Sequence, residues 1–238
     1  MKEYPTDKLR NIALIGHGTC GKTTLADAIL FDLKSISRIG SVDAGSTTMD
    51  YTAAEQKRKI SIQLATGYGE WRDCKINLID TPGYDDFTGE VVAALRATDN
   101  CLLVVSGVSG VEAGTERTFQ MARDQNLPTL MCVGMMDKEH ADFDRVIAQA
   151  QELLSPKIVP LQLPIGSGPA FKGVVDLFKM KAFVHTDAGS EPREEEIPGD
   201  LAADARSARE RLIEAVAEFD DAVIKKYLGG EELTQEEI

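Results

Sequence analysis

The chain has 238 residues, 43% of them hydrophobic, and its 26 lysines and arginines against 39 aspartates and glutamates give a net charge of −13. This length suits one large domain or a domain with a small appendage, and the apolar content excludes a wholly disordered chain. No apolar run approaches the ~20 residues of a transmembrane helix, the N-terminus lacks the apolar core of a signal peptide, and the acidity disfavours non-specific DNA binding. We therefore expect neither a membrane nor a DNA partner. The four scattered cysteines contain no CxxC pair, which favours a reducing cytoplasm over a disulfide framework.

Short apolar runs alternate with helical spacing along the first two thirds of the chain. The runs that predict strands are residues 11–16, 60–69, 75–79, 101–105 and 129–134. The stretches with apolar residues at helical spacing are 22–33, 86–98, 115–125 and 141–154. Residues 34–59, rich in Gly, Ser and Thr, are expected to form a long mobile loop. Strands that alternate with helices predict a doubly wound, mostly parallel α/β sheet with right-handed crossovers.

The pattern changes after Pro160. Residues 158–185 contain short β-like pieces, residues 187–199 are expected to form a loop, and residues 201–219 predict a helix with Leu212, Val216 and Phe219 on one face. Residues 191–238 carry 15 acidic and six basic residues, so most of the net charge lies there. We therefore divide the chain into a main domain, 1–157, and a small acidic α+β subdomain, 158–238.

The residues 16–23, GHGTCGKT, match the phosphate-loop pattern GxxxxGK[ST] at every fixed position. They lie between the first predicted strand and the first predicted helix, the context that this motif requires. Glycines let backbone N–H groups turn toward phosphate oxygens, and the helix N-terminus adds its partial positive charge. Lys22 would reach the β- and γ-phosphates, and the Thr23 hydroxyl would bind Mg²⁺.

Two other interpretations of this loop remain. Gly16, Gly18 and Gly21 also fit the dinucleotide pattern GxGxxG, with Asp43 as the acid that would bind the ribose, although Lys22-Thr23 is surplus to such a site. Cys20, near a helix N-terminus, is a candidate reactive thiol, against the simpler view that its position requires a small side chain.

The sequence Asp80-Thr81-Pro82-Gly83 follows the apolar run 75–79. A carboxylate at the carboxyl end of a strand beside the phosphate loop can hold Mg²⁺ through water. The Gly83 N–H can reach a γ-phosphate because no side chain obstructs it. After a phosphate loop and a further strand, this tetrapeptide indicates the γ-phosphate sensor of a GTPase.

Together with residues 45–62, GSTTMDYTAAEQKRKISI, these motifs resemble the GTP-binding domain of elongation factor G and its paralogues, the translational GTPases. Further stretches extend the resemblance over most of the chain, namely residues 107–119, 161–183 and 219–238. Tyr84 in DTPGY and the VEAGTER segment are more similar to the elongation-factor-G-like paralogues. The resemblance implies a P-loop GTPase fold with an inserted subdomain. It also implies GTP as substrate, GDP as product, Mg²⁺ as cofactor, and the ribosome as partner through its rRNA factor-binding site and its stalk protein.

The same resemblance assigns roles to residues of this chain. Mg²⁺ would be held by Thr23, by Ser61 with Thr48 as runner-up, and by Asp80 through water. Tyr84, Gly83 and Lys22 are the catalytic candidates. The nucleotide-binding candidates are His17, Gly18, Thr19, Cys20, Gly21, Lys22, Thr23, Thr24, Asp80, Gly83, Gly134, Met135 and Asp137. The loop 40–62 would be ordered by the γ-phosphate and released on hydrolysis.

The sequence departs from the family at the reacting centre. Thr19 stands where the family has an aspartate, which removes a negative charge near the phosphates. Tyr84 stands where the family has the water-orienting histidine. A phenol accepts a proton poorly at neutral pH but can orient water, so slow intrinsic turnover is expected. The other possibility is that Tyr84 only packs against the loop.

The guanine-reading motif NKxD is Gly134-Met135-Met136-Asp137 in this chain. Asp137 retains the carboxylate that accepts from guanine, whereas the Asn amide and the Lys are absent. A lost hydrogen bond typically costs on the order of 1 kcal/mol, so weaker guanine binding is expected.

The resemblance ends inside the inserted subdomain, so the sheet is expected to lack its last strand and residues 129–134 are expected to form an exposed edge. The sequence is interpreted as part of a longer protein that is expected to act as a monomer.

Three hypotheses remain from the sequence. The chain is the GTP-hydrolysing domain of a ribosome-dependent factor, or a degenerate G-domain that binds ribosome or nucleotide without turnover, or an ATP-using P-loop enzyme. On the acidic helix, Glu210, Glu214 and Glu218 recur every four residues and share one face. This face is either solvated or able to pair with lysines of the stalk protein.

Overall fold

The structure, a computed structural model, describes residues 3–185 and 191–218 together with Val223, Lys225, Lys226, Gly229 and Thr234. It divides into two compact units, Met1–Met135 and Met136–Ile238. This division precedes the predicted domain boundary at 157/158. Segment 136–157 makes hydrogen bonds to the residues that follow it. The Gly168 N–H donates to the Met136 carbonyl over 2.8 Å, and the Gln151 amide donates to the Ile158 carbonyl over 2.8 Å.

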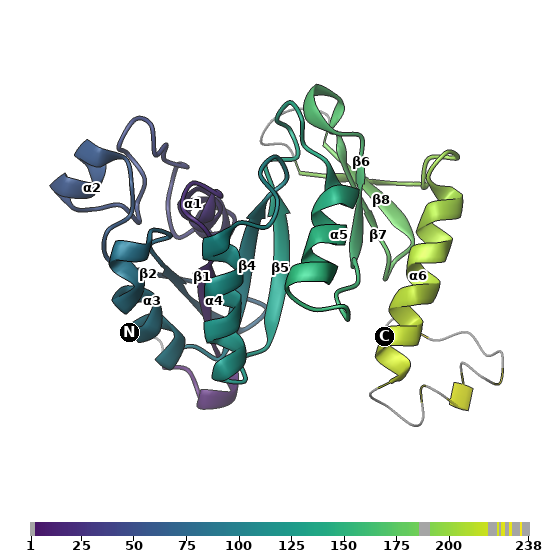
Figure 1. Cartoon of the computed structure of the whole chain (residues 1–238), viewed down its shortest axis with the longest axis horizontal. Coiled ribbons are helices and arrows are strands. Elements are labelled where there is room, and N and C mark those ends of the chain that lie inside the picture. Colours follow the sequence, from purple (N-terminus) through teal and green to yellow (C-terminus); the bar gives the residue numbers. More distant parts are fainter. Residues whose placement is uncertain are drawn as a thin grey trace. The chain divides into compact units, whose positions relative to one another are not determined.

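The first unit is built on a five-stranded sheet in the order β2-β3-β1-β4-β5 (Figure 1). Strands β3, β1, β4 and β5 are mutually parallel, and β2 is antiparallel to β3, so the predicted mostly parallel α/β sheet is confirmed. In the described residues β5 pairs only with β4 and forms the sheet edge, as expected. The strands are β1 (Leu9–Ile15), β2 (Ala65–Trp71), β3 (Cys74–Asp80), β4 (Asn100–Ser106) and β5 (Thr129–Gly134).

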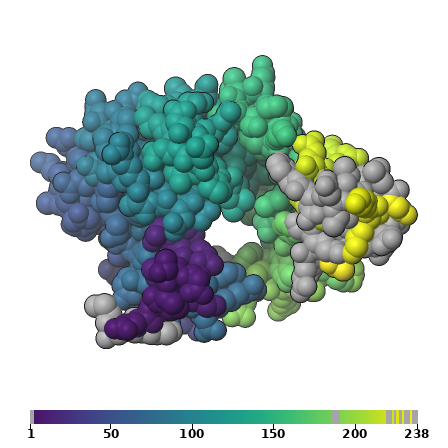
Figure 2. Space-filling view, turned by 90° about the horizontal axis from the view of Figure 1, so that it is seen from below, coloured from purple at the N-terminus to yellow at the C-terminus, as the bar shows by residue number. Residues whose placement is uncertain are grey.

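The helices of the first unit are α1 (Lys22–Asp32), α2 (Ala53–Arg58), α3 (Thr88–Arg96) and α4 (Ala113–Asp124), with the short 3-10 turns η1 (Thr6–Lys8) and η2 (Asp85–Phe87). Helices α1, α3 and α4 pack on the sheet, and α2 lies in the connection between α1 and β2. η1 has no buried residue, and the earliest residues, in purple, lie at the surface in Figure 2. On one face of the sheet, buried apolar side chains from β1, α1, β2, β3 and the segment between α1 and α2 form the core: Leu14, Ala26, Leu30, Met49, Ala65 and Leu78.

The segment predicted to be a loop, 34–59, contains a helix and a core residue. Met49 is buried among the α1 and sheet side chains, and α2 begins after Thr52 with a capping box between Thr52 and Glu55. The box satisfies N–H groups that a short helix otherwise leaves unpaired, which explains a helix in so polar a stretch. The adjacent strand β2 starts at Ala65, five residues later than the sequence indicated.

Among its described residues, the second unit is an antiparallel sheet in the order β6-β7-β8-β9 with the helices α5 and α6, which confirms the predicted separate α+β part (Figure 1). Its elements are α5 (Phe143–Leu153), β6 (Gln162–Ile165), η3 (Gly168–Ala170), β7 (Gly173–Asp176), β8 (Lys181–Val184), β9 (Arg193–Glu195) and α6 (Ala202–Ala217). β9 lies inside the predicted loop 187–199, where its exposed Arg-Glu-Glu sequence shows no strand pattern and pairing to β8 decides the conformation.

Helix α6 places its apolar residues as the sequence predicted. Leu212 is buried and Val216 packs against the same core, while Phe219 lies outside the described residues. Glu210, Glu214 and Glu218 are exposed, and Glu218 pairs with Lys157 over 2.9 Å. Within the described ranges, no helix is both long and apolar enough to cross a membrane.

Replacing Leu14 by alanine is expected to lower the free energy of unfolding by about 2–5 kcal/mol, because this fully buried β1 side chain would leave a cavity. Leu130→Ala on β5, whose side chain is 55% exposed, is the matched control and should change stability by less than ~0.5 kcal/mol. Urea unfolding followed by the fluorescence of Trp71, the only tryptophan, measures both. Equal effects would contradict this account of the core.

Candidate functional site

The predicted phosphate loop connects β1 to α1, the arrangement that the motif requires. Gly16 and Gly21 have φ angles of 139° and 100°, which favour glycine, and a Cβ at Gly16 would collide with the Val104 carbonyl. The buried Lys22 ammonium donates to the Gly16 carbonyl over 3.1 Å and to the His17 carbonyl over 2.7 Å. The loop is therefore closed on its own lysine.

His17 contributes its backbone to the loop, while its ring points toward the start of α4. A Cβ at Gly114 would lie 2.6 Å from His17 Nδ1, so the glycine makes room for the ring. His17 Nε2 lies 3.5 Å from a Glu112 carboxylate oxygen, and Nδ1 is buried with no hydrogen-bond partner in the part of the chain that the structure describes. Its side chain thus contacts α4.

The remaining loop residues differ in exposure. Thr19, with a φ of 63°, and Thr24 are exposed, whereas Cys20 is buried. Burial raises the pKa of the Cys20 thiol, and the nearby Lys22 charge opposes this only in part. The hypothesis of a thiol with a lowered pKa is therefore wrong, because desolvation outweighs the helix N-terminus.

The hydroxyls predicted to bind the metal lie side by side. Thr23 Oγ1 and Ser61 Oγ are 3.0 Å apart, while the runner-up, Thr48, is exposed and donates its backbone N–H to Asp27. Burial raises the pKa of Asp80 to about 7, against a hydrogen bond from Thr23 and the charge of Lys22. Its Oδ1 atom is buried without a hydrogen-bond partner among the described residues.

These groups fit a magnesium ion. Hydroxyl and carboxylate oxygens are the donors that Mg²⁺ prefers, and it retains waters and phosphate oxygens as its other ligands. A cation near Asp80 would satisfy its orphaned oxygen. Across residues 3–185, 191–218 and the isolated described positions, no group of three or more His, Cys, Asp and Glu side chains could hold a metal. The fit therefore depends on hydroxyls and on a bound phosphate.

Gly83 and Tyr84 lie directly on the phosphate loop. A Cβ at Gly83 would be 2.5 Å from the Gly18 nitrogen, so no other residue allows this approach. A Cβ at Gly18 would lie 3.1 Å from two ring carbons of Tyr84, so the Tyr84 ring covers Gly18 closely. The glycine at position 18 and the tyrosine at position 84 are thus complementary in shape.

An ion pair that the sequence did not reveal anchors the residue after Tyr84. Arg117 on α4 pairs with Asp85 over 2.5 Å and holds the pKa of that exposed carboxyl below its usual value. The two residues are far apart in sequence, and although Arg117 ends the VEAGTER segment, no pattern in the sequence pairs it with Asp85. Asp50 was missed as well. Burial raises the pKa of its carboxyl, and Ser61 and Thr47 donate hydrogen bonds to it.

The residues of the guanine motif are divided between the two units. In the first unit, the Met135 methyl would lie 3.5 Å from a Cβ at Gly21, and its sulfur is 3.7 Å from Ser106 Oγ. Met135 therefore lies beside the phosphate loop, where the family uses lysine. Gly134 ends β5, and its carbonyl accepts the Gly107 N–H over 2.8 Å. Asp137 belongs to the second unit and pairs with its neighbour Lys138 over 3.1 Å.

The dinucleotide interpretation disagrees with the topology. After α1 the chain enters β2, which is antiparallel to its neighbour, whereas a dinucleotide fold requires a parallel βαβ unit. Asp43 is exposed in a turn and does not end a strand. This topology excludes the ribose role suggested for Asp43.

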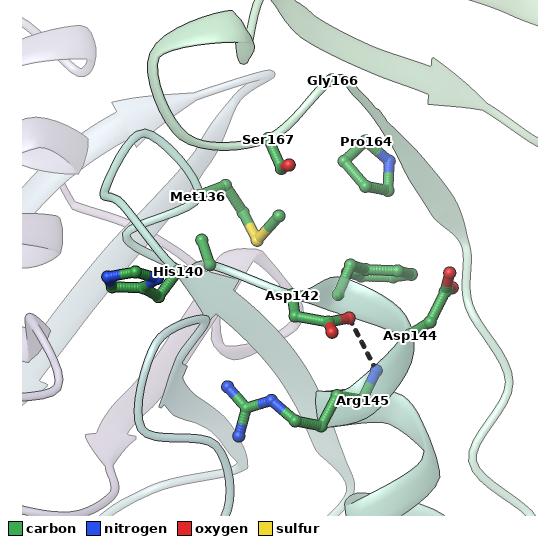
Figure 3. A pocket seen from close by; sticks show the side chains of 10 residues that line it. Met136, His140, Asp142, Asp144, Arg145, Pro164, Gly166 and Ser167 are labelled. Carbon is green, nitrogen blue, oxygen red and sulfur yellow. Dashed lines mark hydrogen bonds between the residues drawn. The ribbon is translucent and has the colours of Figure 1, made fainter.

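A pocket of about 590 Å³ lies within the second unit. Figure 3 shows Met136, Pro164 and Ser167 around it, and the Asp142 carboxylate accepts the Arg145 N–H at the start of α5. Asp142, Asp144 and His140 are exposed at its rim. Every residue that lines the pocket follows Met135, so it is distinct from the phosphate loop.

Comparison with known proteins gives two findings. The family model described as the elongation factor Tu GTP binding domain matches residues 7–228. A crystal structure of a protein from Thermus thermophilus is 36% identical with a TM-score of 0.89, and the match covers 96% of this chain and 34% of that one. This chain therefore spans about a third of the length of that relative. The predicted resemblance to a translational GTPase domain is confirmed.

Cys20 is expected to react with iodoacetamide at neutral pH roughly tenfold or more slowly than Cys74, because the Cys20 thiol is buried and its pKa is raised while Cys74 is half-buried. Mass spectrometry of tryptic peptides over a time course measures both rates in one sample. Labelling of Cys20 as fast as that of Cys74 would contradict this description and restore the reactive-thiol hypothesis.

Proposed function

The chain belongs to the family of elongation factor Tu GTP binding domains, and from this premise we propose that it binds GTP with Mg²⁺ and hydrolyses it to GDP and phosphate. We propose further that it does so as the GTPase domain of a ribosome-associated, elongation-factor-G-like protein. The main support is the convergence of three segments in the first unit. The phosphate loop, the Thr23–Ser61 hydroxyl pair and the Asp80–Gly83 turn lie side by side.

In this proposal, different residues of the first unit bind the phosphates and the Mg²⁺ ion. Lys22 transfers its hydrogen bonds from the Gly16 and His17 carbonyls to the β- and γ-phosphates. The backbone N–H groups of residues 18–24 and the N-terminus of α1 orient and neutralise the phosphate oxygens. Thr23, Ser61 and, through water, Asp80 hold Mg²⁺, which neutralises charge on the β- and γ-oxygens when bound.

Hydrolysis in this family depends on positioning more than on proton abstraction. Gly83 offers its N–H to the γ-phosphate, and the Tyr84 hydroxyl orients the attacking water by a hydrogen bond. The close packing of the Tyr84 ring on Gly18 and the Arg117–Asp85 ion pair support this role, because both fix the start of the segment that carries Tyr84. We expect slow turnover until a partner completes the site.

The second candidate function is a degenerate G-domain that binds ribosome or nucleotide without significant turnover. Met135 favours it, since its apolar side chain occupies the side of the phosphate loop where the family has lysine. Asp137 would still accept from guanine N1–H and N2–H₂, so guanine selectivity would persist with reduced affinity.

We propose the ribosome as partner and the cytoplasm as location. The exposed carboxylates Glu210, Glu214 and Glu218 on α6 would meet lysines of the stalk protein, and the rRNA factor-binding site would meet the first unit and other parts of the protein. Such charge pairing raises association rates and is sensitive to salt. The length of the relative, about three times that of this chain, supports a larger protein. We propose that this protein acts as a monomer.

Titration with fluorescent GDP and ADP tests the nucleotide assignment. GDP is expected to bind at least tenfold more tightly than ADP, because the Asp137 carboxylate accepts from guanine and repels the acceptor edge of adenine. Single-turnover hydrolysis with and without ribosomes then separates the two candidates. Binding without hydrolysis in either condition would favour the degenerate domain, and a preference for ADP would refute both.

Tyr84→Phe is expected to lower the rate of GTP hydrolysis in the presence of ribosomes on the order of 10²-fold while leaving GDP affinity unchanged, because only the water-orienting hydroxyl is lost. Tyr68→Phe on β2, 61% exposed and outside the site, is the control and should leave both quantities unchanged. Equal hydrolysis rates for Tyr84→Phe and the unaltered chain would show that Tyr84 only packs on the loop.

A further inference from the structure

The segment Ser61–Leu64 is held by carboxylates where a sheet would use strand pairing. The backbone N–H groups of Ile62 and Gln63 each donate to Glu55 Oε1 over 3.0 Å, and the N–H of Leu64 donates to Glu90 Oε2 over 2.9 Å. The segment lies outside any strand, and β2 begins only at Ala65. Two glutamates from two different helices thus determine the path of the backbone immediately after Ser61.

Glu55 fastens one side of the segment to α2. It is fully buried, and its second oxygen, Oε2, accepts the Thr52 N–H over 3.0 Å and the Thr52 hydroxyl over 2.7 Å. These hydrogen bonds lower the pKa of its carboxyl although burial opposes them. Glu55 therefore joins the start of α2 to Ile62 and Gln63 as one local unit.

Glu90 holds the C-terminal end of the segment, at Leu64, to helix α3. It is half-buried in the first turn of α3, the helix that follows Tyr84 and the short η2 turn. α3 is a helix, and the segment precedes β2. The hydrogen bond from the Leu64 N–H to Glu90 therefore connects two separate elements of the chain. A shift of the first turn of α3 moves its acceptor away from Leu64.

The hydrogen bond at Leu64 bears on the proposed metal site because Ser61 lies at the other end of the segment. Ser61 Oγ is 3.0 Å from Thr23 Oγ1 at the site proposed for Mg²⁺. Only Ile62 and Gln63, which Glu55 joins into one unit, separate Leu64 from Ser61. Displacement of the backbone at Leu64 is therefore transmitted to Ser61. The Gly83–Tyr84 turn, which leads into α3, is thereby linked through Glu90 and the segment to the hydroxyls proposed to bind the metal.

We propose that Glu90 is a positioning residue that couples the γ-phosphate-sensing turn and α3 to Ser61, so that a shift of the first turn of α3 loosens the hold of Ser61 against Thr23. The coupling itself is a property of the nucleotide-free chain, and its consequence for GTP rests on the proposed function. Such coupling is reciprocal, so ordering of Ser61 by a metal also stabilises the first turn of α3.

A simpler role for Glu90 predicts a different result. An acid in the first turn of a helix stabilises that helix through its dipole, and its loss would weaken α3 as a whole without reference to Ser61. Glu90→Gln distinguishes these roles, since glutamine loses the charge but keeps an oxygen that can accept the Leu64 N–H. The matched control is Glu116→Ala, which removes an exposed acid from the first turn of α4.

Hydrogen exchange of the Ser61–Leu64 amides in the nucleotide-free chain measures the coupling directly. Glu90→Ala is expected to speed their exchange about tenfold or more, because a hydrogen bond to a charged acceptor is lost. Glu90→Gln should recover most of the protection, and Glu116→Ala should change nothing. Unchanged exchange in Glu90→Ala, or an equal loss of protection along the whole of α3, would overturn the proposal.

The consequence for the metal is measured with a non-hydrolysable GTP analogue. Glu90→Ala should raise the Mg²⁺ concentration needed for half-maximal analogue binding several-fold and should affect GDP binding less, with recovery in Glu90→Gln. An unchanged Mg²⁺ requirement despite faster amide exchange would overturn the coupling to Ser61. Absence of all guanine-nucleotide binding in the unaltered chain would instead refute the proposed function, and the exchange experiment would still decide the coupling.

Discussion

The parallel pairing of β1 with β3 is the constraint on which the site depends. Its register places Leu14 opposite Asp80, so the carboxyl ends of both strands meet at one edge of the sheet. The phosphate loop leaves β1 there, and the Asp80–Gly83 turn leaves β3 there. The buried Thr81 hydroxyl, which donates to the Leu14 carbonyl over 2.6 Å, ties the two ends together. A shift of one residue would turn Asp80 to the opposite face of the sheet and separate it from Thr23.

Two buried carboxylates, Asp27 and Glu55, and the half-buried carboxylate of Glu90 organise the polar segment between α1 and β2. Asp27 on α1 is fully buried and accepts the N–H groups of Gly40 and Thr48, while Glu55 and Glu90 accept those of residues 62–64. Buried carboxylates are costly unless they are well hydrogen-bonded, and these replace the strand partners that the segment lacks. The path of the segment therefore depends on the positions of the helices that carry these carboxylates.

The substitutions at the reacting centre occur as matched pairs. Tyr84 is larger than the histidine of the family, and Gly18 leaves the space that its ring occupies. Arg117 and Asp85 then anchor the following turn to α4. Met135 similarly lies beside the loop in place of a lysine. The altered residues are thus packed closely against the phosphate loop.

The sequence by itself determined the alternation of strands and helices, the phosphate loop and the Asp80–Gly83 turn. Each depends on short-range patterns, since apolar periodicity, glycine conformations and fixed motif spacing act within a few residues. Only the tertiary structure decided that polar residues 53–58 form α2, that β9 pairs with β8 and that the compact units divide at Met135. It also decided the partners of Asp50, Glu90 and Arg117. These features depend on contacts between residues far apart in the chain, where a carboxylate or an arginine has many possible partners and only packing selects one.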